Sequence, residues 1–348
     1  MPSLIARIDP VDKTAGDRAR AYLDTLTKPP GSLGALEALA VQLSEISKEL
    51  APAVTPPAVI VFAADHGVAA EGVSAFPQAV TAQMVANFAR GGAAINVFAR
   101  QINARLEVVD VGVLGDVEAP GVVVEKVRRA TGNITVEDAM QPFEVEAALQ
   151  AGEKAVARAY EAGCRSVIVG EMGIANTTAS SAMLAAFTGT PVEQVVGAGS
   201  GLDSQQQVHK AGVITRALAA RKFDADTPLS VLAALGGLEI AAMAGAYLAA
   251  ARYRLPAIVD GFIATVAALT ACRLCPAVRG YLVFGHRSME PGHGVALRAL
   301  DATPLLALDM RLGEGSGAAL AFPLLQAATA MMADMATFTS AGMADSTP

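Results

Sequence analysis

The chain has 348 residues, of which 53% are hydrophobic and 17% charged, with no tryptophan and a formal net charge of -7. This composition predicts an aliphatic α/β protein of one large or two modest domains, and the acidic balance without a basic block argues against a nucleic-acid partner. Arg7, Asp9 and Asp12 interrupt the N-terminal segment where a secretion signal needs an apolar run, so we expect a cytoplasmic protein.

The first elements in chain order are helices over residues 15–50, interrupted by a turn at residues 28–34 with the sequence Lys-Pro-Pro-Gly-Ser-Leu-Gly. A continuous apolar run at residues 58–63 then ends at Asp65-His66-Gly67. Runs of this kind are typical of parallel strands that are covered on both faces.

Six further apolar runs of strand length follow, and most are separated by Ala-rich stretches of helical length. They lie at residues 106–111, 166–169, 229–234, 256–259, 281–284 and 305–308. The alternation predicts an α/β fold with a largely parallel sheet and helices on both faces, Rossmann-like, with ligands beyond the carboxyl ends of the strands. We expect a large domain over residues 52–316 and a small helical subdomain formed by residues 1–51 together with 317–348, the two chain ends.

Residues 229–251 are apolar and long enough to span a bilayer. They contain Glu239 and several glycines, however, and Arg252 and Arg254 follow. We therefore expect no membrane partner. Cys272 and Cys275 form a C-x-x-C pair, but their place in an apolar helical run favours buried small residues over a redox site.

Two glycine-rich segments have the composition of anion sites. In residues 170–181, glycines and hydroxyl groups surround Glu171, while Asn176 and Thr177 are placed to cap a helix. An ordinary helix cap would explain Asn176 alone. The second segment, residues 197–203, matches neither a Walker loop nor the dinucleotide fingerprint, and Lys210 after it is either a ligand contact or a solvated helix residue.

In residues 310–319, just after an apolar run, a single carboxylate residue, Glu314, lies among Gly313, Gly315 and Gly317. Glycine lets backbone approach a ligand closely, and the following Ala-rich stretch can begin a helix whose free N–H groups attract anions. A plain strand-to-helix turn with a solvated glutamate is the alternative.

Asp65-His66-Gly67 and residues 286–293 contain potential metal ligands, but their dispersal favours roles in loop geometry, and we expect no metal. No G-x-S-x-G elbow is present, which argues against a serine hydrolase.

Five segments together resemble the nicotinate-nucleotide:dimethylbenzimidazole phosphoribosyltransferase family. The resemblance extends from about residue 25 to 335, and its segments are residues 28–34, 64–68, 170–178, 259–262 and 311–317. It implies a parallel α/β domain plus a small domain from both chain ends, in a homodimer. It also implies transfer of the phosphoribosyl group of nicotinate mononucleotide to 5,6-dimethylbenzimidazole or a related base, giving α-ribazole 5'-phosphate and nicotinate without a cofactor or metal.

The resemblance implies that Glu314 is the general base and that Glu171 stabilises positive charge developing on the ribose. The remaining residues expected to bind substrate are Gly173, Asn176, Thr177, Thr178, Gly199, Gly201, Lys210, Asp260, Ser288, Gly313, Gly315 and Gly317. The chain departs from the family in its acceptor-base pocket, where Phe76 and Met84 stand in place of a polar Ser and Gln. We hypothesise that this apolar wall broadens acceptor choice; neutral drift is the alternative.

Two rival functions stay open at this point. One is a non-catalytic nucleotide-binding relative, against which the intact acids Glu171 and Glu314 argue. The other is a hydrolase that releases nicotinate without any acceptor.

Overall fold

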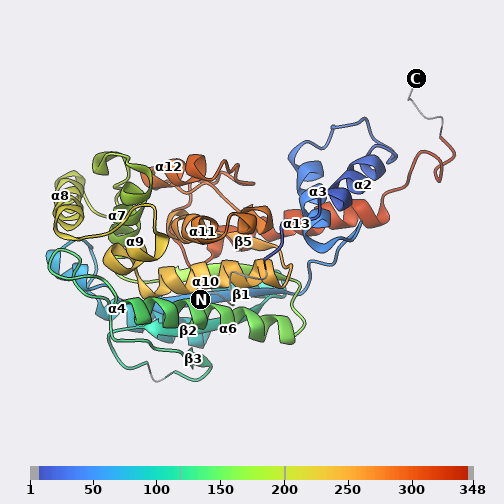
Figure 1. Cartoon of the computed structure of the whole chain (residues 1–348). Coiled ribbons are helices and arrows are strands. Elements are labelled where there is room, and N and C mark those ends of the chain that lie inside the picture. Colours follow the sequence, from blue (N-terminus) through green and yellow to red (C-terminus); the bar gives the residue numbers. More distant parts are fainter. Residues whose placement is uncertain (1–7, 118, 200, 344–348) are drawn as a thin grey trace.

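The computed structural model describes residues 8–117, 119–199 and 201–343. Within these residues the core is a six-stranded, all-parallel sheet with strand order β3-β2-β1-β4-β5-β6 (Figure 1). The strands are β1 (Pro57–Ala64), β2 (Arg105–Gly112), β3 (Val122–Val124), β4 (Ser166–Met172), β5 (Ala257–Val259) and β6 (Leu282–Phe284). The chain changes direction across the sheet between β1 and β4, which is where parallel α/β folds place their ligands.

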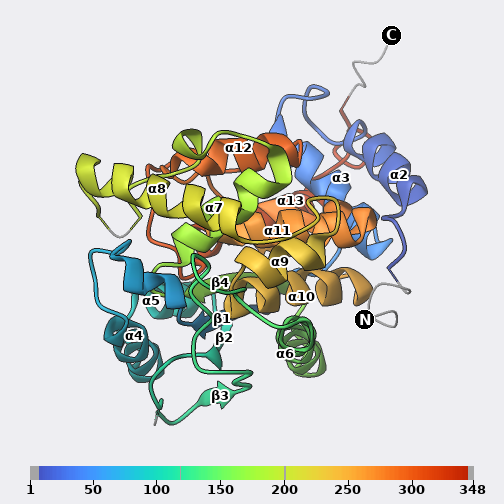
Figure 2. The same ribbon diagram turned by 60° about the vertical axis from the view of Figure 1, so that its left-hand side comes forward.

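Helices cover both faces of the sheet (Figure 2). On one face lie α6 (Pro142–Glu161), α10 (Leu238–Arg252) and α11 (Phe262–Leu274), and on the other lie α4 (Ala79–Arg90), α5 (Ala94–Gln101) and α13 (Ser316–Asp334). The remaining helices are α2 (Lys13–Leu23), α3 (Ala35–Ser47), η1 (Gly67–Glu71), α7 (Asn176–Thr188), η2 (Val192–Gln194), α8 (Ser204–Ala220), α9 (Pro228–Leu235), η3 (Pro276–Tyr281) and α12 (Pro291–Ala299). The predicted fold class is confirmed.

Side chains of β1 alternate between the two cores, because successive residues of a strand point to opposite faces. Ile60 and Phe62 join the core under α6, α10 and α11, whereas Val59 and Val61 join the core under α4, α5 and α13. All eight residues of β1 are buried, as a continuous apolar run predicts.

Helices α6 and α10 pack unusually closely, since glycines face backbone at their contact. A Cβ at Gly152 would lie 1.8 Å from the carbonyl oxygen of Ala242, and one at Gly245 would lie 2.0 Å from that of Leu149. This packing holds the start of α10, and with it Glu239, against the carboxyl edge of the sheet.

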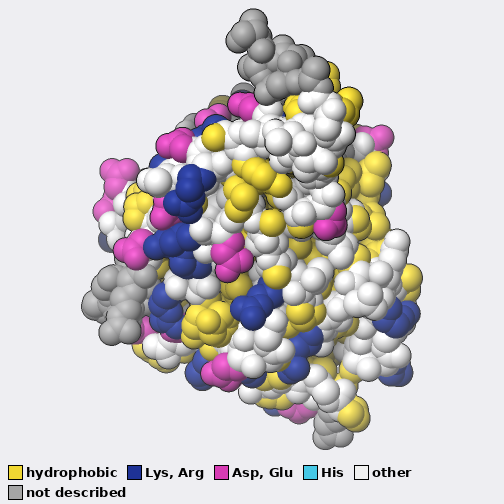
Figure 3. All heavy atoms as spheres, turned by 90° about the vertical axis from the view of Figure 1, so that its right-hand side faces the viewer, with side chains coloured by type: hydrophobic (Ala, Val, Ile, Leu, Met, Phe, Trp, Pro, Cys, Tyr) yellow, Lys and Arg dark blue, Asp and Glu magenta, His cyan; other side chains and the backbone are white. Residues whose placement is uncertain are grey.

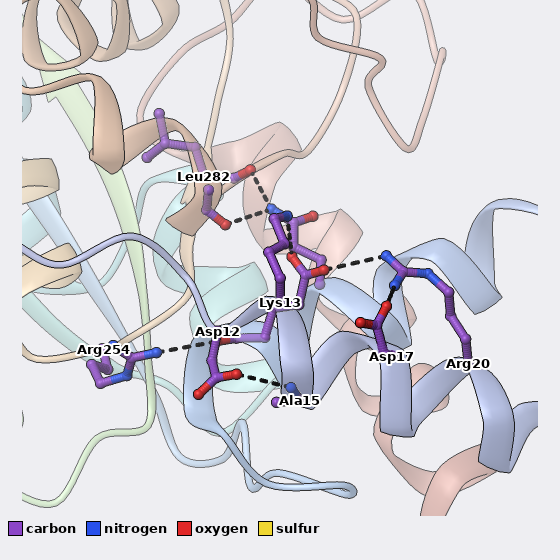
Figure 4. A network of polar contacts seen from close by, with 10 residues as sticks. Asp12, Lys13, Ala15, Asp17, Arg20, Arg254 and Leu282 are labelled. Atoms are coloured by element: carbon purple, nitrogen blue, oxygen red, sulfur yellow. Dashed lines mark hydrogen bonds and ion pairs between the residues drawn. The ribbon is translucent and has the colours of Figure 1, made fainter.

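A small helical region, α2 and α3 with the C-terminal half of α13, lies beside the sheet (Figure 1). Polar contacts hold it there: Gln42 of α3 donates to the carbonyl oxygens of Gly280 (3.1 Å) and Leu282 (2.9 Å), and Arg254 donates to that of Glu45 (3.1 Å). Figure 4 shows Arg254 and Leu282 beside the start of α2, where Asp12 and Lys13 lie. Basic, acidic and apolar side chains are intermixed on the face in Figure 3. These helices belong to the small subdomain predicted from residues 1–51 and 317–348, and the boundaries of that subdomain stay a prediction. Of its residues, 1–7 and 344–348 lie outside the described part of the chain.

Among the described residues, α13 is the one helix that is long and apolar enough to cross a membrane. More than half of its apolar window is buried inside the molecule, and Phe322 and Leu325 are fully buried in the core beneath the sheet. The helix therefore has the character of a core helix.

Two predicted strands are wrong. Residues 229–234 form helix α9, because Pro228 occupies the first turn and a buried apolar run has no period that separates helix from strand. Residues 305–308 make only an isolated bridge between Leu306 and His286, and Leu308 is 54% exposed, so they form a loop along the edge of β6. The short strand β3 was not predicted.

Candidate active site

A cavity of about 480 Å³ lies beyond the carboxyl ends of β4 and β5. That volume is within the ordinary range for small-molecule sites. The described residues that line it are Phe76, Val80, Met84, Glu171, Met172, Gly173, Ile174, Asn176, Thr177, Gly199, Asp260, Gly261, Phe262, Ile263, Ala264, His286, Ser288, Glu290, Arg311, Leu312, Gly313 and Glu314. They come from loops and helix starts that are distant in sequence, as the strand order requires.

Glu314 projects into this cavity from the loop before α13. Its backbone has a φ of +65°, and its side chain is only 5% exposed. One carboxylate oxygen accepts from the backbone N–H of Ile95, at the start of α5, over 3.4 Å. Burial raises the pKa of Glu314, with the charge of Asp260 adding to the rise and the Ile95 N–H opposing it. A carboxyl group with a raised pKa is a better proton acceptor than an ordinary surface glutamate.

Asp260 holds the loop that carries Glu314. Its two oxygens accept from the backbone N–H groups of Gly315 (3.2 Å) and Ala318 (2.9 Å), which caps the start of α13. His286 also contacts it, Nε2 to Oδ1, at 3.3 Å. Asp260 lines the cavity, but its hydrogen bonds give it a positioning role.

Glu171 lies near the end of β4, 7% exposed, and accepts a short hydrogen bond from Asn176 Nδ2. Burial raises the pKa of Glu171 to about 8, and the neighbouring carboxylates Glu239, Asp260 and Glu314 add to the rise. The 313–317 loop passes against it so closely that a Cβ on Gly313 would lie 2.2 Å from Glu171 Oε1. Gly313 is therefore required both for its φ of +89° and for this contact.

A basic group lies behind one end of the cavity. Lys210 of α8 is 1% exposed, and its ammonium donates to Thr177 Oγ1 over 2.6 Å. Burial lowers the pKa of Lys210 to about 8, while the charge of Glu290 opposes this. Gly199 lies beside them and donates its N–H to Glu290 Oε1 at 3.0 Å. Thr177, in the first turn of α7, lines this end, so an ammonium and a hydroxyl group meet where an anion could bind.

One wall of the cavity is apolar, in contrast to the basic end. It is formed by Phe76, Val80 and Met84. Phe76 is 52% exposed, and Met84 comes from the second turn of α4. The cavity thus combines a basic end, an apolar wall and the two acids Glu171 and Glu314.

The structure brings together most of the site residues predicted from sequence. Those that line the cavity are Glu171, Glu314, Gly173, Asn176, Thr177, Gly199, Asp260, Ser288, Gly313, Phe76 and Met84. Five others do not line it: Thr178, Gly201, Lys210, Gly315 and Gly317. Thr178 is fully buried inside α7, and Gly317 packs so closely on His286 that a Cβ would lie 2.0 Å from its ring.

The burial of Lys210 excludes the alternative of a solvated helix residue. Its ammonium donates to Thr177, which lines the cavity, and lies beside Gly199.

Sequence reasoning did not assign Arg311, Glu290 or the start of α11 to the site. Arg311 donates to the Gly199 carbonyl oxygen at 3.3 Å, which joins the two glycine-rich loops over the cavity. A signal was present for α11, because Asp260-Gly261 ends a strand and a helix start follows it at the same edge of the sheet. Within the described ranges, no group of three or more His, Cys, Asp or Glu side chains is arranged to hold a metal ion.

The sequence and the structure of the chain are similar to those of known proteins. A family model described as "Phosphoribosyltransferase" matches residues 8–343. The nicotinate-nucleotide–dimethylbenzimidazole phosphoribosyltransferase of Xanthomonas oryzae pv. oryzae is 55% identical over 332 residues, 94% of each chain. That of Pseudomonas putida is 51% identical over 337 residues, 97% of this chain and 96% of its own. The crystal structure of CobT from Thermus thermophilus superposes with a TM-score of 0.92 at 47% identity, covering 95% of this chain and 99% of its own.

Proposed function

The chain belongs to the phosphoribosyltransferase family that these relatives represent, and from this membership we propose the reaction it performs. It transfers the 5-phosphoribosyl group of nicotinate mononucleotide to 5,6-dimethylbenzimidazole or a related base. The products are α-ribazole 5'-phosphate and nicotinate, in the synthesis of the lower-ligand nucleotide of cobalamin.

The acids of the cavity fit the donor substrate. Nicotinate mononucleotide carries a positive charge on its pyridinium ring, and as the C1'–N bond breaks this charge moves to the ribose while the ring leaves with the bonding electron pair. Glu171 and Glu314 both face the cavity and are held in low-dielectric surroundings, where an anion stabilises a nearby cation more strongly than in water. The leaving ring needs no proton, so no general acid is required.

The acceptor is the harder half of the reaction. A benzimidazole attacks C1' through one ring nitrogen, and the new C1'–N bond leaves the base cationic until the other nitrogen loses its proton. Glu314 is the proton acceptor in this scheme, because it faces the cavity and burial raises its pKa, which makes it a stronger base than an exposed glutamate. Attack on the face opposite to nicotinate converts the β anomer to the α anomer.

The phosphate of the donor fits the end of the cavity near Thr177, Gly199 and Lys210. Thr177, in the first turn of α7, lines this end, and the buried ammonium of Lys210 behind it supplies the charge. Because the protein as a whole is acidic, this local arrangement has to attract the phosphate.

The observation that carries the proposal is the meeting of Glu171, near the end of β4, and Glu314, in the loop before α13, in one cavity that also has a basic end and an apolar wall. The test is incubation of purified protein with nicotinate mononucleotide, with and without dimethylbenzimidazole, followed by chromatography of the products. Nicotinate release that requires the acceptor supports transfer. Release at the same rate without acceptor would identify a hydrolase, and binding without release would identify a non-catalytic relative.

We infer further that the apolar wall broadens acceptor choice. Phe76 and Met84 present no hydrogen-bonding groups that would select between aromatic bases of similar shape. In competition assays dimethylbenzimidazole, benzimidazole, methyladenine and phenols should all be used, and the variant Phe76→Ser/Met84→Gln should have a narrower range. Strict use of dimethylbenzimidazole by the unaltered protein would overturn this inference.

We also propose that the protein is a cytoplasmic homodimer. The family resemblance supports the dimer, and light scattering on the purified protein would measure it. The three cysteines Cys164, Cys272 and Cys275 are unpaired, which is typical of a reducing compartment. Fractionation of cells that produce the protein would test the location.

A further inference from the structure

Helix α4 carries two of the three residues of the apolar wall, yet little of it is buried. Val80 and Met84 line the cavity from this helix. Of its 12 residues, only Thr81, Val85 and Phe88 are buried, in one stripe at helical spacing. Val85 and Phe88 pack into the core beneath the sheet. The end of the stripe that is nearest to Val80 is therefore a threonine, which is 0% exposed.

Thr81 joins three parts of the chain through one hydroxyl group. Its Oγ1 atom donates to Asp65 Oδ1 over 2.7 Å and accepts from the backbone N–H of Ile174 over 3.1 Å. Because a hydroxyl group has a single proton, the proton points to the carboxylate and a lone pair faces the N–H. Asp65 follows β1, and Ile174 lines the cavity from the segment after β4. The hydroxyl thus ties the wall helix to the end of β1 and to another part of the cavity lining.

Asp65 is a fixed point for this contact. It is 1% exposed, and its second carboxylate oxygen accepts from the backbone N–H of Leu114, after β2, at 2.9 Å. Its own backbone N–H donates to Gly112 and its carbonyl oxygen accepts from Thr131, both over 3.0 Å. Asp65 is therefore held by backbone on several sides, and it passes this rigidity to the wall helix through Thr81.

A second polar contact holds the same end of the helix. Gln78, the residue before α4, donates its Nε2 to the carbonyl oxygen of His66 over 2.8 Å. Both contacts reach the Asp65-His66-Gly67 segment at the end of β1. A buried hydroxyl group costs free energy unless it is hydrogen-bonded, so Thr81 favours the one helix position that satisfies both of its partners. A valine at this position would pack without that constraint.

We propose that Thr81, assisted by Gln78, is a positioning residue that fixes the apolar wall for the acceptor base. The inference rests on the proposed function, because it takes this wall as the surface against which the base lies. A flat aromatic base gains affinity from close contact with Val80 and Met84, and a gap of less than 1 Å already loses a large part of that contact. The nucleotide phosphate binds at the basic end near Thr177, to which α4 does not contribute.

The test is steady-state kinetics of nicotinate release, with separate KM values for 5,6-dimethylbenzimidazole and for nicotinate mononucleotide. Thr81→Val removes the hydroxyl group and keeps the shape of the side chain. It should raise KM for the base about fivefold or more and change KM for the nucleotide less than about twofold, because only the wall shifts. Thr81→Ser keeps the hydroxyl group, so it should restore KM for the base.

The matched control is Thr270→Val in α11. Thr270 is also 0% exposed, but its hydroxyl group donates to the carbonyl oxygen of Val266 in its own helix, over 2.9 Å. It does not line the cavity. This variant should leave both KM values unchanged, whatever its melting temperature.

Three results would overturn the inference: an unchanged KM for the base in Thr81→Val, an equal rise of both KM values, or the same rise in Thr81→Ser. If Thr81→Val does not fold, Gln78→Met takes its place, because Gln78 is only partly buried and methionine keeps its length. That variant should raise KM for the base about threefold, and an unchanged value would contradict the proposal. Failure of the proposed function is distinguishable, because the unaltered protein would then show no nicotinate release that depends on the base.

Discussion

Replacement of Glu314 by Gln tests the proposed base with little change of shape. The amide oxygen of glutamine can still accept from the N–H of Ile95, and Gly313 and Gly315 keep the loop in place. The ability to take up a proton is lost, and with it the negative charge of the carboxylate.

The expected loss follows from the geometry. Glu314 faces the cavity, is 5% exposed, and within the described chain has one backbone donor, so its other oxygen is available to the acceptor base. General-base assistance contributes typically about 10²–10⁴-fold, which corresponds to about 2.7–5.4 kcal/mol in the activation barrier. We expect kcat to fall by that factor, with a much smaller change in KM for the nucleotide.

The assay is acceptor-dependent nicotinate release as a function of pH. Because only the ionised carboxylate can accept a proton, activity of the unaltered protein should rise with pH through the raised pKa of Glu314, and the variant should lack this rise. As a control, 1-methylbenzimidazole has no ring proton to lose, so the ratio of the two rates should be smaller with this acceptor, and the ratio that remains measures the loss of the negative charge. Wild-type turnover by a folded Glu314→Gln protein would refute the assignment.

Three further changes test the rest of the site. Lys210→Gln should raise KM for the nucleotide about tenfold or more, because a charge-assisted contact is lost; it should also remove the fall of kcat/KM above a pH of about 8, where Lys210 loses its proton. Gly313→Ala should lower kcat at least tenfold, since the added Cβ would lie 2.2 Å from Glu171. The control is Gly212→Ala in helix α8, where a Cβ would have no neighbour within 4 Å. This variant should keep its activity and melt at a slightly higher temperature. Asp260→Ala should cost about 1–2 kcal/mol in urea unfolding and lower kcat, because the cap of α13 is lost; unchanged stability would argue against the capping role.

The pattern of apolar residues was sufficient to predict those strands of the sheet that are buried on both faces. The run at residues 58–63 becomes β1, and the glycine-flanked acids Glu171 and Asp260, at the ends of β4 and β5, meet at one edge because parallel strands all point the same way. Glu314 joins them from a loop that precedes α13. The same signal failed at residues 229–234, since an apolar run without alternation is equally compatible with a buried helix.

Contacts between residues that are distant in the chain could not be predicted from the sequence. Glu314 meets the N–H of Ile95, 219 positions away, and Glu239 meets His66, 173 positions away. No local spacing encodes these pairs, because they depend on the order of strands in the sheet. For the same reason Lys210 could not be recognised as buried from its own helix.

The most direct test of the account is the configuration of the product. When the protein is incubated with nicotinate mononucleotide and 5,6-dimethylbenzimidazole, proton NMR of the isolated nucleotide should show the α anomer, formed in equal amount to nicotinate. A β-configured nucleotide, or ribose 5-phosphate with no base attached, would contradict single-step transfer between the two acids.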